Sequence, residues 1–278
     1  MLVRILAAAV GLPLLLAIVL LLPPIGTAVL FALACMIGAY EMLWRTGICK
    51  HKRIVAETAL MSAAVVMWSW LLACQVVSTR TLWLSALIGL FVYSSVLFCE
   101  LLAGHTELKF TSVCAALFSG IVYPFLIGAL VRLRGMDGGK FYILVAFLIS
   151  MVADSGAYFV GRACGKHKLA PVVSPKKTVE GSVGGIVFCV AAFLIYGWVL
   201  ERFADVNPDY LVFAVGGIFT SVVSQAGDLI MSAIKRSRGI KDFGKILPGH
   251  GGMLDRFDSV MAVSLMLLFL ESFFGLMN

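Results

Sequence analysis

Long apolar runs, each close to the length of a membrane-spanning helix, occupy most of the chain. A helix that crosses a bilayer needs about 20 predominantly apolar residues, because the hydrocarbon core is about 30 Å thick. Runs of this kind lie near residues 5–22, 26–44, 54–76, 81–103, 111–131, 141–161, 181–200, 210–233 and 257–277. The pattern predicts an all-α integral membrane protein, a polytopic bundle of about nine transmembrane helices.

The composition excludes a soluble protein. Of the 278 residues, 61% are hydrophobic and only 13% are charged. Soluble domains are about 45–50% apolar and about 25% charged, so this chain could not cover a water-facing surface. It carries 22 Lys and Arg against 15 Asp and Glu, a net charge of +7. In a membrane protein such an excess reflects basic cytoplasmic loops, so we expect no nucleic-acid partner.

The basic residues are distributed unevenly between alternate loops. In the nine-span pattern, 17 of the 22 Lys and Arg fall on the side of the N-terminus. Because cytoplasmic loops are rich in Lys and Arg, we expect the N-terminus in the cytoplasm, the C-terminus outside, and the protein in the cytoplasmic (inner) membrane. Residues 1–140 then form about five N-terminal spans. Residues 141–278 form a C-terminal region that carries the two long loops, 162–180 and 234–256, both basic and cytoplasmic.

Two carboxylates lie deep inside apolar runs. Asp154 shares a helix face with Ser150, and Asp228 lies on a polar stripe that continues to Lys235 and Arg236. A charge in a membrane costs about 2.5–3.5 kcal/mol on insertion scales, so such residues are functional by default. Two alternatives are weighed against this reading. The polar stripes can simply hold helices together, or Asp228 can merely pair with Lys235 or Arg236.

The first long loop ends in Ser174-Pro175-Lys176-Lys177-Thr178, directly before the next apolar run. Pro175 favours an extended Ser174, and Thr178 is in position to cap the following helix. Lysines beside a helix N-terminus form an anion site, because free backbone N–H groups and the helix dipole attract the same anion. On charge alone, a phosphate-binding segment and an anchor to lipid headgroups are equally compatible with this stretch.

The second long loop mixes cations with carboxylates and glycines. The carboxylates are Asp242, Asp255 and, just after the loop, Asp258, and the glycines Gly249, Gly251 and Gly252 surround His250. Asp255 and Asp258 are three residues apart at the expected start of a helix, so they can share a face. Cations suit phosphates, carboxylates suit a divalent metal, and glycines allow close approach of backbone to a ligand. Together they predict a site for phosphoryl or nucleotidyl transfer.

From Ser232 to Asp258 the sequence resembles the signature of the phosphatidate cytidylyltransferases, also called CDP-diacylglycerol synthases. The shared pattern is Ser-x-apolar-Lys-Arg, four residues, Lys-Asp, and then Pro-x-His-Gly-Gly-apolar-x-Asp-Arg-apolar-Asp. The run from Asp154 to Arg162 and the Ser-Pro-Lys-Lys-Thr-x-Glu-Gly stretch are also similar to that family. Residues 1–140 match it only as hydrophobic spans.

The resemblance implies the reaction of CTP with phosphatidate to give CDP-diacylglycerol and pyrophosphate, with Mg²⁺ and room for a second cation. The lipid phosphate is already a nucleophile and attacks the α-phosphorus of CTP. The protein must therefore mainly bring two anions together and neutralise the leaving pyrophosphate. An active site that faces the cytoplasm lets the acyl chains stay among membrane lipids while CTP arrives from water. The resemblance is compatible with a homodimer.

The resemblance and the residue chemistry assign three groups of site residues. The catalytic group is Asp228, Asp255, Lys235, Arg236 and Asp258. The substrate-binding group is Asp154, Lys166, Ser174, Lys176, Lys177, Thr178, Glu180, Lys241, Asp242, His250, Gly251, Gly252 and Arg256. Asp228 and Asp255 are the expected metal ligands, because two carboxylates with CTP phosphates suffice for Mg²⁺. Glu41 lies nearer to the end of its run and is expected at the membrane interface.

Other functions fit the sequence less well. A CTP-dependent polyprenol or lipid kinase would transfer the γ-phosphate, but the complete Ser232–Asp258 pattern argues against it. A CDP-alcohol phosphotransferase would need an Asp-Gly-x-x-Ala-Arg motif, which the sequence lacks. A transporter can also hold intramembrane carboxylates, although two motif loops on one side suit it poorly. A scaffold would leave Asp154 and Asp228 unexplained.

Overall fold

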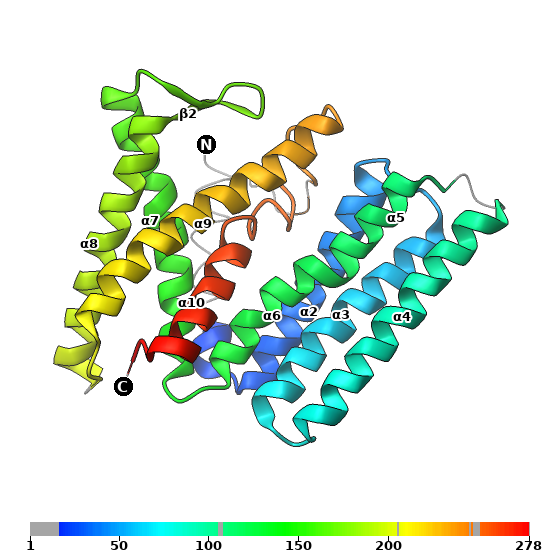
Figure 1. Cartoon of the computed structure of the whole chain (residues 1–278), viewed down its shortest axis with the longest axis horizontal. Coiled ribbons are helices and arrows are strands. Elements are labelled where there is room, and N and C mark those ends of the chain that lie inside the picture. Colours follow the sequence, from blue (N-terminus) through cyan, green and yellow to red (C-terminus); the bar gives the residue numbers. More distant parts are fainter. Residues whose placement is uncertain (1–16, 105–107, 205, 245, 247–250, 278) are drawn as a thin grey trace. The chain divides into compact units, whose positions relative to one another are not determined.

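Helices make up most of the described chain. The computed structural model describes residues 17–277 apart from 105–107, 205, 245 and 247–250. The α-helices of this part are α2 (Pro24–Tyr40), α3 (Lys52–Cys74), α4 (Thr79–Ala103), α5 (Phe110–Leu117), α6 (Tyr123–Arg134), α7 (Gly139–Cys164), α8 (Val179–Ala204), α9 (Tyr210–Ser237) and α10 (Val260–Phe274) (Figure 1). Two short π-helices, η1 (Glu41–Arg45) and η2 (Phe118–Val122), follow α2 and α5. The predicted all-α class is confirmed.

Seven continuous helices of the described chain are long and apolar enough to cross a membrane. They are Pro24–Arg45, Lys52–Cys74, Thr79–Ala103, Phe110–Arg134, Gly139–Cys164, Val179–Ala204 and Tyr210–Ser237. These match the second to the eighth predicted runs, and the chain is an integral membrane protein. The first predicted run, 5–22, falls mainly on residues outside the described chain.

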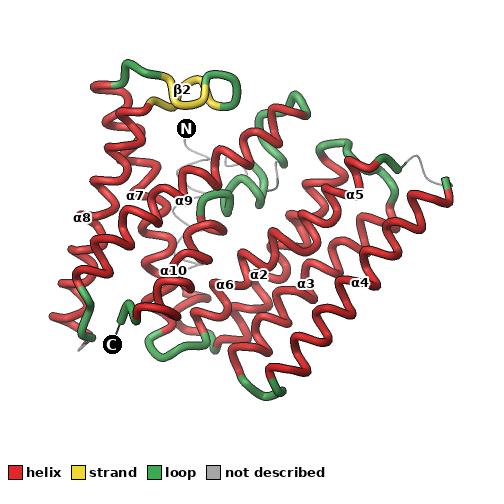
Figure 2. The backbone as a smooth tube through the Cα atoms, viewed as in Figure 1, coloured by secondary structure: helices red, strands yellow, loops and turns green. Residues whose placement is uncertain are grey.

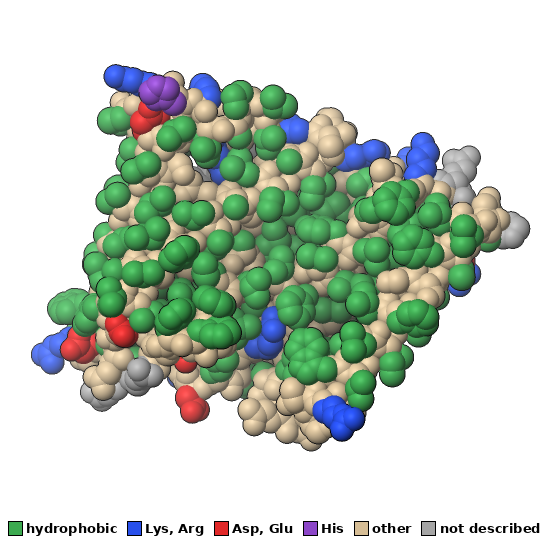
Figure 3. Space-filling model, viewed as in Figure 1, with side chains coloured by type: hydrophobic (Ala, Val, Ile, Leu, Met, Phe, Trp, Pro, Cys, Tyr) green, Lys and Arg blue, Asp and Glu red, His purple; other side chains and the backbone are tan. Residues whose placement is uncertain are grey.

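Apolar side chains cover much of the outer surface, as a bundle in lipid requires. Along α4, for example, Leu87 is 60% exposed, Ile88 63% and Phe91 73%. Figure 3 shows hydrophobic side chains spread over the flanks of the helices, with the visible charged side chains mainly near helix ends. In water such a surface would aggregate, whereas lipid tails cover it at no cost.

The last predicted run forms a shorter helix than expected. α10 has 15 residues, which gives about 22 Å at 1.5 Å per residue, against about 30 Å for a hydrocarbon core. Residues 253–259 form turns and bends, and α10 begins only at Val260. The expectation that Asp255 and Asp258 share a face at a helix start is therefore wrong. Apolar composition alone did not reveal the irregular backbone before the helix.

The chain divides into two compact units. Unit 1 comprises Met1–Lys140 and Asp242–Phe257, and unit 2 comprises Phe141–Lys241 and Asp258–Asn278. The second long loop therefore contributes to both units, because Lys235 and Arg236 belong to unit 2 and Asp255 belongs to unit 1. Whether residues 141–278 act as a separate catalytic region stays a prediction.

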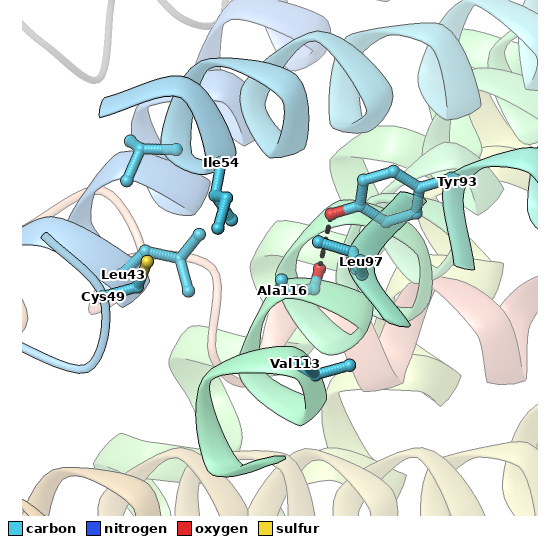
Figure 4. Packing of buried hydrophobic residues seen from close by; sticks show 8 residues of the cluster. Leu43, Cys49, Ile54, Tyr93, Leu97, Val113 and Ala116 are labelled. Atoms are coloured by element: carbon cyan, nitrogen blue, oxygen red, sulfur yellow. Dashed lines mark hydrogen bonds between the residues drawn. The ribbon is translucent and has the colours of Figure 1, made fainter. Parts of the chain in front are cut away.

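In unit 1, a buried cluster joins η1 to the ends of the neighbouring helices. α3 packs against α2, α4 and α6, and η1 contacts α5. The cluster consists of Leu43, Cys49, Ile54, Val55, Tyr93, Leu97, Val113 and Ala116 (Figure 4). The Tyr93 hydroxyl lies 2.8 Å from Thr58 Oγ1 and 3.3 Å from the carbonyl oxygen of Ala116, so its polar end is satisfied. Leu43 of η1 is fully buried in this cluster, which fixes η1 in place.

In unit 2, glycines allow α7 and α8 to approach closely. A Cβ atom at Gly184 would lie 2.5 Å from Val160 Cβ, and one at Gly181 would lie 2.6 Å from the carbonyl oxygen of Ala157. Neither distance leaves room for a side chain, so small residues set the separation of the two helices. α8 also packs against α9, and α9 packs against α10.

The first long loop folds into a short antiparallel hairpin. It is formed by β1 (Lys168–Ala170) and β2 (Ser174–Thr178), drawn in yellow in Figure 2. Lys168 pairs with Thr178, and Ala170 pairs with Ser174. Ser174 is thus in extended backbone, as Pro175 predicted. The hairpin places Lys176 and Lys177 on a strand that runs directly into α8.

Candidate functional site

The base of the hairpin is tied to the first turn of α8. Thr178 Oγ1 accepts a hydrogen bond from Gly181 N at 3.1 Å, so the predicted helix cap is confirmed. The Glu180 carboxylate accepts the backbone N–H of Lys166 at 3.1 Å and that of His167 at 3.2 Å, and lies 2.6 Å from His167 Nδ1. Glu180 therefore holds the start of the hairpin against the helix that the hairpin precedes.

Lys177 and Asp228 form an ion pair between the hairpin and α9. Lys177 Nζ lies 2.5 Å from Asp228 Oδ2, and their side chains are only 22% and 23% exposed. Ser232 Oγ donates to the other carboxylate oxygen of Asp228 at 3.3 Å. Lys176, the neighbouring residue on the strand, is exposed, because successive side chains of a strand point in opposite directions. Of the two predicted lysines, Lys177 is the one that contacts a predicted carboxylate.

The sequence left open that Asp228 merely pairs with Lys235 or Arg236, but in the structure it forms an ion pair with Lys177. Arg236 instead donates from Nε to the Val173 carbonyl at 3.3 Å and from Nη1 to the Ile240 carbonyl at 3.0 Å. It thereby joins the tip of the hairpin to the residues that follow α9. Lys235 is buried, with 8% of its surface exposed.

Asp258 lies in unit 2 just before α10. A Cβ atom at Gly227 would lie 2.6 Å from the carbonyl oxygen of Asp258, so the backbone here is pressed against α9 one residue from Asp228. Ser259 N donates to Asp258 Oδ1 at 2.9 Å. The predicted catalytic residue thus lies beside the turn of α9 that carries Asp228.

The pKa of Asp258 is shifted by its burial and by three charged residues of unit 2. Burial raises the pKa of Asp258 to about 7, and the negative charges of Asp228 and Asp154 act in the same direction. The positive charge of Lys235 opposes them. Two predicted carboxylates and a predicted cation of unit 2 therefore act on Asp258, although Asp154 and Asp228 lie on different helices.

The rest of the polar stripe has a packing role. Gln225 Nε2 donates to the Ser182 carbonyl on α8 and to Ser221 Oγ, both at 3.2 Å. Ser150 Oγ donates to the Ala146 carbonyl of its own helix at 2.8 Å. The bond from Gln225 to Ser182 joins α9 to α8, as expected of a polar residue that holds helices together, whereas the other two stay within one helix.

In unit 1, the residues around Asp255 form a tight backbone turn. Asp255 is 7% exposed, and its Oδ2 accepts the N–H of Phe243 at 2.8 Å and that of Gly252 at 3.0 Å. Gly251 has a φ of +85°, which only glycine adopts readily. Asp242 and Arg256 are exposed, as is Lys241 of unit 2. The predicted site residue His250 lies outside the described residues.

Sequence reasoning missed Glu41. This residue was expected at the membrane interface, a depth that stays a prediction, but the sequence did not predict its complete burial in unit 1. Its Oε2 accepts the N–H of Leu254 at 3.1 Å, next to Asp255. The signal in the sequence is a glutamate inside an apolar run, the same signal that singled out Asp154 and Asp228.

The carboxylates present have the chemistry of a magnesium site. Asp228, Asp255 and Asp258 offer the hard oxygen ligands that Mg²⁺ prefers. Within the described ranges, no group of three or more His, Cys, Asp or Glu side chains gathers around one point. One or two carboxylates would thus have to be completed by water and by substrate phosphates, which is the usual arrangement for this ion. Because Asp228 and Asp255 belong to different units, a shared metal stays a prediction.

Comparison with known proteins places the chain among cytidylyltransferases. Residues 2–274 match the model of the "Cytidylyltransferase family". A phosphatidate cytidylyltransferase of Bacillus subtilis is 43% identical over 162 residues, which cover 58% of this chain and 57% of the relative.

Two staphylococcal relatives of the same name match a shorter stretch. That of Staphylococcus saprophyticus is 51% identical and that of Staphylococcus aureus 50% identical, each over 125 residues. In both cases the match covers 45% of this chain and 46% of the relative. The chain thus spans about half the length of the curated relatives it matches.

Proposed function

This chain belongs to the cytidylyltransferase family, and on that premise we propose that it transfers CMP from CTP to phosphatidate. The products are CDP-diacylglycerol, an intermediate of phospholipid biosynthesis, and pyrophosphate. An oxygen of the lipid phosphate attacks the α-phosphorus of CTP, and the bond from this phosphorus to the bridging oxygen of the pyrophosphate breaks. The attacking phosphate is already ionised, so the reaction needs no general base. Relatives that carry the name phosphatidate cytidylyltransferase support the choice of lipid substrate.

The observation that carries the proposal is the Lys177–Asp228 ion pair. It places a cation suited to phosphate against a carboxylate suited to a divalent metal, with a separation of 2.5 Å. Lys177 also lies one residue before Thr178, the cap of α8, where free backbone N–H groups attract anions. We infer that a CTP phosphate takes the place of Asp228 as the partner of Lys177. Lys235 adds positive charge near the same carboxylates.

We propose Asp228 and Asp255 as the magnesium ligands, with Asp258 in support. Bound Mg²⁺ would neutralise the phosphate charge that develops on the leaving pyrophosphate. Asp228 is half-buried and already faces the cation of Lys177, with Ser232 at its other oxygen. The backbone N–H groups of Phe243 and Gly252 hold Asp255 in one orientation, which prepares a carboxylate for a ligand. A second cation belongs to the proposal only through the family resemblance.

Two isotopic labels test the reaction. Purified protein in detergent is mixed with Mg²⁺, phosphatidate and CTP that carries label at the α- or the γ-phosphate. The proposal expects α-label in the lipid and γ-label in pyrophosphate. Label from the γ-position in the lipid would instead identify a CTP-dependent lipid kinase. Lipid without label from either position, with no pyrophosphate, would refute both.

A matched pair of variants on α9 tests the site. Asp228→Asn should abolish turnover because it removes a charge and leaves the shape, and Mg²⁺ titration should show a lost or weakened dependence. Asp209→Asn is the control, because Asp209 caps the other end of the same helix by accepting the N–H of Leu211 at 2.9 Å. Asn caps helices as well as Asp does, so this variant should keep its activity. Equal turnover of both variants would contradict the assignment.

We further propose that the N-terminus and the hairpin face the cytoplasm and that the protein lies in the inner membrane. The charge asymmetry of the loops supports this orientation. Reporter fusions within residues 162–180 should report the cytoplasm, and fusions after residue 278 the outside. The same side for both would contradict the topology. A homodimer completes the proposal, and the mass of the detergent-solubilised protein by light scattering tests it.

A further inference from the structure

Glu41 is a carboxylate buried within unit 1. None of its surface is exposed. It begins η1, the π-helical turn at the end of the long helix Pro24–Arg45. π-Helical turns inside longer helices occur frequently at functional sites. A buried acid in an apolar helix is costly, so it must do something that an apolar residue could not.

The contacts of Glu41 lead to one segment far along the chain. The described residues between 242 and 257, namely 242–244, 246 and 251–257, belong to the same unit, and we name them the signature loop. Glu41 Oε2 accepts the N–H of Leu254 at 3.1 Å. A Cβ atom at Gly244 would lie 2.0 Å from Glu41 Oε1, and one at Gly252 would lie 2.5 Å from Oε2. The carboxylate thus fits between two glycines of the signature loop, where any other residue would displace it.

Asp255 holds the same turn from within the loop. Its Oδ2 accepts the N–H of Gly252 at 3.0 Å and that of Phe243 at 2.8 Å. Two carboxylates therefore bind successive parts of one short backbone stretch, Glu41 at Leu254 and Asp255 at Gly252. These contacts give a reason for Gly252 that the sequence did not: it makes room for the carboxylate of Glu41.

The anchor of Glu41 is rigid. Leu43, two residues further along η1, is fully buried in the cluster that joins η1 to α3, α4 and α5 (Figure 4). Because Leu43 is packed in this cluster, the backbone of η1 is held in place, and so is the position from which Glu41 contacts the signature loop.

We propose that Glu41 is a positioning residue for the signature loop, which it holds in the conformation that presents Asp255. The inference rests on the proposed function only in giving Asp255 a catalytic role. Glu41 itself touches backbone, so it acts through the loop. Removing it should loosen residues 242–257 before it affects the rest of the protein.

Three variants separate this role from general stabilisation. Glu41→Ala removes the acceptor, and Glu41→Gln keeps an oxygen that can still accept the N–H of Leu254. Glu271→Gln is the control, because Glu271 also lies in an apolar helix and accepts a backbone N–H, that of Leu276 at 2.8 Å, outside the signature loop. Each is assayed for kcat and KM with CTP, and for the rate of tryptic cleavage in residues 241–256 relative to residues 166–177.

We expect Glu41→Ala to speed cleavage in the signature loop while cleavage in the hairpin stays at the wild-type rate. Leaving the buried N–H of Leu254 without its acceptor should lower kcat/KM roughly 10- to 100-fold. Glu41→Gln should recover part of both effects, and Glu271→Gln should match the wild type.

Two results would overturn the proposal. One is wild-type cleavage and turnover in Glu41→Ala. The other is equally faster cleavage in both loops, which would make Glu41 a general stabiliser. If the wild type itself does not convert CTP and phosphatidate, the proposed function fails. The cleavage ratio needs no substrate and still decides the role of Glu41.

Discussion

Asp258 should make the protein less stable as the pH rises towards neutral. Burial, and then the charges of Asp228 and Asp154, raise the pKa of Asp258 from an ordinary 3.8 to about 7. Between these two values the folded protein keeps a proton that the unfolded chain releases. By linkage, the free energy of unfolding then falls as the pH rises through this range and levels off above it.

The size of the effect follows from the two pKa values. A rise from 3.8 to about 7 corresponds to roughly 4 kcal/mol between acidic and neutral pH. Asp258→Asn cannot ionise, and its side-chain oxygen can still accept the N–H of Ser259. We therefore expect this variant to match the wild type near the acidic end of the range and to be more stable, by up to about 4 kcal/mol, above neutrality. Its activity should fall, because stability gained at a functional site commonly costs function.

The assay is chemical unfolding of chelator-treated protein in mixed micelles, followed by far-ultraviolet circular dichroism between about pH 4 and about pH 8. The quantity of interest is the difference between variant and wild type, because the effects of carboxylates that do not interact with Asp258 cancel in it. Asp209→Asn is the matched control, since Asp209 is exposed and caps α9. Its difference from the wild type should not depend on pH. A difference for Asp258→Asn that is equally flat, or that grows as the pH falls, would refute the reasoning.

Two further substitutions test contacts of unit 2. Lys177→Met leaves Asp228 without its half-buried partner, so it should lower the free energy of unfolding by roughly 1–3 kcal/mol and raise the KM for CTP. Lys168→Met, which changes an exposed lysine on the other strand of the hairpin, should do neither. Gly184→Ala should lower the thermal midpoint in detergent because its Cβ would lie 2.5 Å from a side chain of α7, whereas Gly89→Ala, with its nearest atom at 3.9 Å, should not. Unchanged KM and stability in Lys177→Met, or equal midpoints for the two alanine variants, would contradict these contacts.

Much of the fold could be predicted because the bilayer restricts the choice of structure. A chain in lipid must satisfy its backbone polar groups internally, so a long apolar run becomes a helix. The run predicted at 181–200 is the helix Val179–Ala204, and its cap Thr178 follows from local chemistry. The start of α10 could not be predicted in this way. The predicted run begins at residue 257, but residues 253–259 form turns and bends in which Asp255 accepts the N–H of Phe243, a contact that is not local in sequence.

The sequence could single out individual residues of the candidate site, but it could not show which of them contact one another. Lys177 and Asp228 each stood out, one beside a helix start and the other inside an apolar run. Their pairing depends on how the hairpin leaves α8 and on how α8 packs against α9, and neither is local in sequence. Judged by charge alone, Lys235 would have been as good a partner for Asp228 as Lys177.

Glu41 shows that depth in the membrane and burial in the protein are different quantities. The distance of a residue from the end of an apolar run indicates its depth in the membrane, and this distance predicts Glu41 at the interface. Its burial comes from Gly244 and Gly252, about 200 residues further along the chain, whose missing side chains leave space for the carboxylate. Glycines in a functional loop are usually explained by approach to a ligand. Here part of the reason is approach to another part of the same chain, which a single sequence cannot show.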